Sequence, residues 1–391
     1  MDEQKYSTLW EALRDVPDPR AARGKRYEWS CLLVLLVSAL VSGQRNGRAI
    51  GQWVQEHASE LVAHLQPAKG RLPSTATLRR VLCRVDLTAL EERVAQYSQA
   101  LVEPHAAPTA SPSPTADTAE TPLRGHALDG KAVRGANKHG TALHLVSVTQ
   151  HGSGIVLAQR AVDDKSNEIP AAAELLAGRA LRGTVTTLDA LLAQQELLQQ
   201  IRDQQGHSLA VIKRNQPHTY AAIQLVFNEP PWRGAEYAEE YRWVQTINKG
   251  HGRLETRTLE RTTALNDYLA WPDVGQVLRR TWRRVRLSTG EVEEEVSYAI
   301  TSLHPQQADA AALEAFWRGH WTIENRTHYV RDVTFGEDAC QIHTHNAPHA
   351  LAVLRNALLN LLRHTGWHNI ADALRHYGAY VSRALALVGV P

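Results

Sequence analysis

The chain has 391 residues, of which 43% are hydrophobic and 21% charged, so two or three folded units are expected and a disordered or fibrous protein is excluded. Its 43 lysines and arginines nearly balance 41 acidic residues, and this +2 net charge neither requires nor excludes nucleic acid as a partner. Three scattered cysteines and a start without a secretory signal exclude a disulfide framework and a cysteine metal site, and indicate a cytoplasmic protein.

Residues 1–102 are expected to form an all-α N-terminal domain. The most apolar segment, residues 29–43, has about a dozen apolar residues, too few to cross a bilayer, so it is predicted to be a buried helix. Residues 75–86 and 87–102 carry apolar side chains every three to four positions, as amphipathic helices do. The next segment, residues 103–122, is rich in Pro, Ala, Ser and Thr, and it is predicted to be a flexible linker.

After the linker the hydrophobic pattern changes to that of strands. Three consecutive strands are predicted at 126–133, 141–150 and 154–162. A helix, a strand at 183–190, a second helix and a strand at 208–215 follow. This order is that of the ribonuclease H-like fold, so we expect an α/β catalytic core with a mixed sheet at residues 123–391.

A β-rich insertion is predicted within this core at about 216–305, before further helices from residue 309 onward. Its segment LRRTWRRVR, residues 278–286, permits two interpretations. In the first, Arg283 and Arg284 contact DNA phosphates and the neighbouring Trp282 stacks on an exposed base. Alternatively, the segment forms a hairpin whose arginines pair with the acidic run EVEEEV that follows it.

Three carboxylates in this order indicate a metal site. Asp129 lies within the first strand and Asp189 at the end of the fourth, and these strands are neighbours in a sheet of this kind. Glu324, on a later helix, can supply a third carboxylate. Hard divalent cations prefer oxygen ligands, and a pair of them supports phosphoryl transfer without a covalent protein intermediate. Taken singly, each acid is equally compatible with a turn, a cap or a solvated helix position.

Several motifs, met in order, resemble one family. They are ALDGKAVRGA, TLDA, HGRLETR, YAITSL, RGHWTIENRTHYVRDVTFGEDA and NAPHALAVLRNALLNLLR. Together they resemble the ISAs-type, H-repeat-associated insertion-sequence transposases of the DDE group. Residues 8–54 resemble the N-terminal domain that accompanies that group. The resemblance covers nearly the whole chain outside the linker.

The resemblance implies a DNA transposase whose ribonuclease H-like core binds Mg²⁺ or Mn²⁺, as two ions, through Asp129, Asp189 and Glu324. It implies cleavage at the ends of an insertion sequence and strand transfer into target DNA. The expected partners are double-stranded DNA, as terminal inverted repeats and target, and a second copy of the chain in the synaptic complex. A bacterial cytoplasmic, nucleoid-associated protein is expected, with residues 1–102 serving end binding or dimerisation.

Related transposases carry a Tyr, Arg, Glu, Lys pattern at a spacing where this chain has Trp317, His320, Glu324 and Arg331. If His320 and Arg331 replace the basic pair of that pattern, we expect them to contact phosphates near the cleaved bond. Lys131 and Arg134, just after Asp129, either neutralise a phosphate or pair with acids.

Three questions stay open. Asp338 is a candidate metal ligand, and the alternative is that Asp332, Glu337 and Asp338 cap or brace the helices around Glu324. His126, His320 and His328 flank the acids without a zinc-type spacing. For the function, the alternatives are a catalytically silent DNA-binding protein derived from a transposase and a metal-dependent nuclease that does not join strands.

Overall fold

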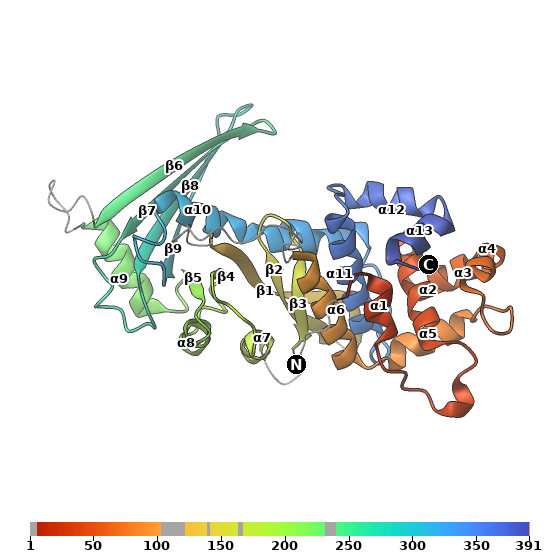
Figure 1. The fold of residues 1–391 in the computed structure, drawn as a ribbon. Helices are drawn as coiled ribbons and strands as arrows, with labels where there is room; N and C mark the ends of the chain where they lie inside the picture. The colour runs from red at the N-terminus through yellow and green to blue at the C-terminus, as the bar shows by residue number, and fades with distance from the viewer. Residues whose placement is uncertain (1–5, 103–121, 139–140, 163–166, 231–239, 391) are drawn as a thin grey trace, which may run out of the picture. The chain divides into compact units, whose positions relative to one another are not determined.

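A computed structural model describes residues 6–102, 122–138, 141–162, 167–230 and 240–390 (Figure 1). The linker predicted at 103–122 therefore lies outside the described residues, except for Pro122. The chain divides into two compact units by its contacts. The first contains Met1–Ala116, Gly130–Ala171 and Ile323–Pro391, and the second contains Asp117–Asp129 and Ala172–Thr322.

The first unit is mainly helical. Its α-helices are α1 (Leu9–Arg14), α2 (Trp29–Val41), α3 (Gly47–Glu56), α4 (Ala58–Leu65), α5 (Thr75–Arg84), α6 (Leu87–Val102), α11 (Ala347–His364), α12 (Ile370–Gly378) and α13 (Val381–Val388). A 3₁₀ turn (Ala22–Gly24) precedes α2, and two π-helical segments, Ile323–His328 and Val330–Thr334, precede α11. Two strands, β2 (Thr141–Gln150) and β3 (Val156–Ala161), complete the unit with the second half of β1 (Arg124–Lys138).

One hydrophobic core joins the N-terminal helices to the C-terminal ones. Helix α2 is apolar on all sides, and it is therefore buried in this core, as predicted. Helix α11 packs beside it. Among the described residues, no helix is both long and apolar enough to cross a membrane. Because helices from both ends of the chain share this core, the first compact unit is not limited to the predicted domain of residues 1–102.

The second unit is built on a sheet. Its strands are the first half of β1, β4 (Thr184–Leu188), β5 (His207–Ile212), β6 (Tyr241–Gly250), β7 (Arg253–Thr262), β8 (Gln276–Arg286) and β9 (Val292–Thr301). Strand β4 pairs in parallel with both β1 and β5, and β9 runs antiparallel to β5. Along the whole sheet the strand order is β3-β2-β1-β4-β5-β9-β8-β7-β6.

Three helices lie near the sheet in the second unit, α8 (Gln195–Asp203), α9 (Pro217–Asn228) and α10 (Ala310–Gly319). A further helix, α7 (Glu168–Leu176), crosses the boundary between the units. Leu313 and Trp317 of α10 pack on the apolar side chains of the strands, including Leu259 and Leu278. This packing holds the C-terminal end of α10 against the sheet, and His320 follows directly.

The predicted insertion at 216–305 contains helix α9 in addition to the long strands β6 to β9 (Figure 1). Strands β8 and β9 form the predicted hairpin, with Arg283 opposite Glu294 and Arg284 opposite Glu293. Arg284 and Glu293 form an ion pair of 3.2 Å, so the acidic run does pair with the arginine-rich strand.

Candidate metal centre

The parallel pairing of β1 with β4 sets the positions of two of the predicted acids on neighbouring strands. Leu128 pairs with Leu188 in the register of these strands. Asp129 and Asp189 each follow one member of this pair, and β4 ends at Leu188. The Oδ1 atom of Asp189 accepts a hydrogen bond of 2.9 Å from the backbone nitrogen of Leu192, so this carboxylate also caps the turn after β4.

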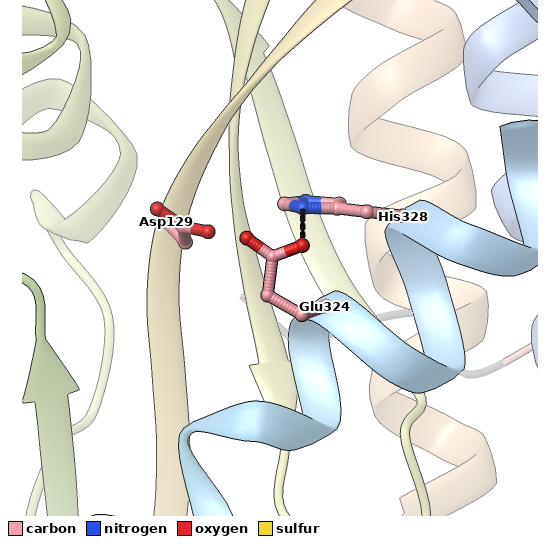
Figure 2. A group of neighbouring side chains, drawn as sticks. All are labelled: Asp129, Glu324 and His328. Carbon is pink, nitrogen blue, oxygen red and sulfur yellow. Dashed lines mark ion pairs between the residues drawn. The ribbon is translucent and has the colours of Figure 1, made fainter. Parts of the chain in front are cut away.

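Asp129, Glu324 and His328 form a group of potential metal ligands. One ligand atom from each side chain lies within 4.8 Å of the others. Figure 2 shows the Glu324 carboxylate between the Asp129 carboxylate and the His328 ring. Two carboxylates at this spacing repel each other unless a cation lies nearby, and oxygen donors of this kind suit Mg²⁺ or Mn²⁺.

Glu324 and His328 lie four residues apart on the π-helical segment Ile323–His328, so their side chains are about one turn apart and share one side of it. Segments of this kind are frequent at functional sites. The Nδ1 atom of His328 lies 3.5 Å from an Oε atom of Glu324. His328 is buried, whereas the Glu324 side chain is 55% exposed and accessible to a ligand.

Burial lowers the pKa of His328, and the neighbouring Glu324 carboxylate opposes this effect without cancelling it. The charges of Arg331 and Lys131 lower the pKa further. The imidazole is therefore neutral around pH 7, and the neutral ring is the form that binds a metal or accepts a hydrogen bond.

The predicted phosphate ligand Lys131 instead pairs with an acid. Its side chain is buried and its Nζ atom lies 2.5 Å from Oδ1 of Asp332. Asp338 accepts a hydrogen bond of 3.3 Å from the backbone nitrogen of Arg134, whose side chain is exposed. Asp332 and Asp338 therefore attach the π-helical region to β1, which agrees with the bracing alternative.

Glu337 is at the centre of a buried ionic network. Its Oε2 atom lies 2.7 Å from Arg331, and its Oε1 atom lies 3.0 Å from Arg355. Burial alone raises the pKa of Glu337, but the charges of Arg331, Arg355 and Lys131 outweigh it, so the pKa is lowered and the carboxylate is ionised. The predicted contact of Arg331 with DNA phosphates does not agree with this arrangement, because the side chain is 0% exposed.

His320 lies near Asp189 instead of at the surface of α10. Its Nδ1 atom is 3.0 Å from Oγ1 of Thr187, two residues before Asp189 on β4. Thr187 Oγ1 also donates a hydrogen bond of 3.2 Å to the carbonyl of His126. Trp317, at the tyrosine position of the related pattern, is buried beneath the guanidinium of Arg280, 4.4 Å from its ring centroid.

The two arginines of β8 that are predicted to contact DNA differ in their surroundings. Arg283 is exposed on β8. Arg284 is partly buried, stacks over the Trp282 ring at 4.3 Å and lies near Glu255 and Glu293. The contacts of Arg284 are therefore within the hairpin. Among the residues predicted to contact DNA, Arg283 and Arg134 are the more exposed cations.

Glu168, which the sequence did not single out, lies over Gly130, the residue after Asp129. A Cβ atom added to Gly130 would be 2.1 Å from the carboxyl carbon of Glu168, although this flexible side chain can move away. At Gly135 a Cβ would be 2.5 Å from the carbonyl oxygen of Cys340. Because that atom belongs to the backbone, glycine is required at position 135.

Comparison with known proteins identifies the family. Residues 113–361 match the transposase DDE domain model, and residues 10–98 match the model of the domain associated with it. The chain belongs to the DDE transposase family. The matched region contains all three predicted acids, and the second match covers helices α2 to α5.

Several bacterial relatives of this DDE transposase carry related names. The putative transposase YncI of Escherichia coli O157:H7 is 28% identical, over 91% of this chain and 87% of its own length. The H repeat-associated putative transposase YhhI of Escherichia coli K12 is 25% identical, over 90% of both. These names agree with the resemblance found in the sequence. Among solved structures, a piggyBac transposase in a synaptic complex with hairpin DNA matches with a TM-score of 0.44 and 8% identity, covering 97% of this chain and 76% of that one.

Proposed function

We propose that this DDE transposase binds the ends of an insertion sequence and catalyses metal-dependent DNA cleavage and strand transfer. The observation that carries the proposal is the convergence of carboxylates. Asp129 lies with Glu324 and His328 within 4.8 Å, and Asp189 follows the neighbouring parallel strand at the same sheet edge. A family that uses Asp, Asp and Glu gives these three acids their roles.

The donor set fits a divalent cation. Asp129, Asp189 and Glu324 would hold Mg²⁺ or Mn²⁺, as two ions in the completed site. When bound, the metal supplies a site that activates water or a 3′-hydroxyl and stabilises the leaving oxygen of the phosphodiester. Asp129 and Asp189 would be held in place by the sheet, which is the rigid support that a catalytic group requires.

His328 would orient the Glu324 carboxylate. Its neutral ring, kept so by burial, lies 3.5 Å from that carboxylate and restricts its rotation. His320, held by Thr187 near Asp189, would contact a phosphate close to the cut bond. Lys131 and Arg331 would stabilise the structure around the site and not contact DNA, since both are buried in ion pairs.

The strand order β3-β2-β1-β4-β5 supports a ribonuclease H-like core. In this interpretation the two acids occupy its first and fourth strands, and strands β6 to β9 are the insertion. Arg134 and Arg283, both exposed, would contact DNA phosphates. Two DNA ends must be brought together, so a dimer is the expected assembly.

Incubation of the full chain with a duplex carrying one element end, in Mg²⁺ or Mn²⁺, tests the proposal. We expect a cut at the element boundary and joining of the freed 3′-end to a second duplex. Binding without any cut would identify a silent DNA-binding protein, and cutting without joining would identify a nuclease. Either result would contradict the proposal.

A further inference from the structure

A groove of about 400 Å³ lies within the first unit. It lies between the start of α3, helix α5, and the segment that leads into α11. Its lining residues are Asn46, Gly47, Arg48, Thr75, Arg79 and Leu82, with the second wall formed by 339–347. Arg48, Arg79 and His343 are exposed, so their charged or polar groups are accessible in the groove.

The residues that line the groove include two arginines, Arg48 and Arg79, and one histidine, His343. None of the lining residues is Asp or Glu. The two guanidinium groups therefore give the lining a positive charge. An anionic ligand is therefore favoured.

The groove wall is held in place by hydrogen bonds. Arg79 Nη2 lies 3.3 Å from Oγ1 of Thr344, which holds the guanidinium at the groove. Asn346 Nδ2 donates a hydrogen bond of 2.9 Å to the carbonyl of Val85. The Oδ1 atom of Asn46 accepts from the backbone nitrogen of Arg48, so this side chain caps α3.

The groove is also connected to the segment that carries Glu324. Arg355 donates to the carbonyl of Arg45, at 3.2 Å, and pairs with Glu337. Glu337 pairs with Arg331 of the second π-helical segment. A buried chain of polar contacts therefore fixes one side of the groove relative to the turn that presents Glu324.

We propose that this groove binds the phosphate backbone of the transposon DNA, through Arg48 and Arg79. The proposal rests on the function proposed above and adds a binding site whose lining contains none of the proposed metal ligands. Arginine recognises phosphate oxygens with paired N–H donors, and contacts of this kind position a duplex without reading its sequence. The groove thereby sets where DNA lies relative to Glu324.

The test compares the double variant Arg48→Ala/Arg79→Ala with Arg80→Ala as a matched control. Arg80 lies next to Arg79 on α5 and is also exposed, but its guanidinium bonds to Ala76 and Thr77 of its own helix and does not line the groove. Fluorescence anisotropy of a labelled duplex carrying the element end, and of a random-sequence duplex, is measured without metal at several salt concentrations. Thermal unfolding of each variant confirms its fold.

We expect the double variant to bind both duplexes about tenfold more weakly and to lower the slope of log K against log salt by about 2, while Arg80→Ala stays close to wild type. Equal binding by the double variant and the control would overturn the groove proposal alone, provided that wild type binds and cuts. If the wild-type chain binds neither duplex, the proposed function fails as well. A loss confined to the element end would contradict backbone recognition.

Discussion

Leu128 and Leu188 pair in register on two parallel strands, and the residue after each of them is an aspartate. Asp129 and Asp189 therefore each lie one residue beyond a registered pair on neighbouring strands. We propose that their carboxylates face one site, although the group of potential ligands within 4.8 Å contains Asp129 and not Asp189. The third acid, Glu324, reaches Asp129 from a π-helical turn that is remote in sequence.

Asp189 caps the turn after β4 and is proposed to bind metal, and substitution can separate these two roles. Asp189→Asn keeps an oxygen that accepts from the Leu192 nitrogen, so we expect nearly wild-type stability with loss of metal-dependent cutting. Asp189→Ala also loses this hydrogen bond, and we expect it to cost a further ~1 kcal/mol in unfolding free energy. Urea unfolding and a nicking assay measure the two effects. Normal cutting by Asp189→Asn would show that the carboxylate serves only as a cap.

His328 is expected to tune metal binding without being required for folding of the sheet. His328→Gln removes the ring beside the Glu324 carboxylate, and we expect Mn²⁺ affinity to fall by about 10- to 100-fold. Titration calorimetry with Mn²⁺ measures the change, with His364→Gln, an exposed histidine near the end of α11, as the control. Unchanged affinity in His328→Gln would separate the histidine from the metal group.

Arg331 is expected to stabilise the fold and not to contact DNA. Arg331→Met leaves the buried Glu337 carboxylate with one cationic partner fewer, and we expect a loss of about 3–5 kcal/mol in unfolding free energy. Arg202→Met, on the exposed side of α8, serves as the control and should change little. Chemical denaturation measures both. A stable Arg331→Met variant with weakened DNA binding would restore the original prediction of a phosphate contact.

The lowered pKa of His126 leads us to expect that the stability of the fold depends on pH. Burial lowers its pKa to about 4, with smaller contributions from Arg179 and Arg124. The unfolded chain therefore binds more protons than the folded one between the folded pKa and the ordinary pKa of about 6.5. This contribution to stability is complete above pH 6.5 and is lost as the pH falls toward 4, amounting to on the order of 3 kcal/mol.

Urea unfolding of His126→Asn and of wild type across this pH window measures the His126 contribution. The variant should show a flatter profile, since asparagine does not titrate. If the two profiles run parallel from pH 6.5 down to 4, the acid sensitivity of the wild type comes from other groups.

The local parts of this structure were accessible from the sequence because they depend on nearby residues. Short apolar runs bounded by Gly, Asn and His predicted strands β1 and β4, on or after which Asp129 and Asp189 lie. The pairing of EVEEEV with the arginines of β8 is one of the two interpretations that the sequence permits. The family resemblance implied the three acids and was confirmed by the family match.

The long-range parts were not accessible in this way. Periodicity shows that α2 is buried but not that its partners include α11, more than three hundred residues later. Arg331 and Lys131 are charged residues next to the predicted site, and only their three-dimensional partners show that both are buried. The i, i+4 spacing of Glu324 and His328 was visible, but a regular helix and a π-helical turn cannot be distinguished by spacing alone.

The most direct test of the metal group is the cutting of an element-end duplex in Mn²⁺ by Asp129→Asn and Glu324→Gln. Both variants keep the size of the side chain and remove a charge, and Glu196→Gln on the exposed face of α8 is the matched control. We expect both site variants to bind DNA like wild type and to give no detectable cut, while the control cuts normally. Cutting at the wild-type rate by either variant would contradict the assignment of these carboxylates to the catalytic metal.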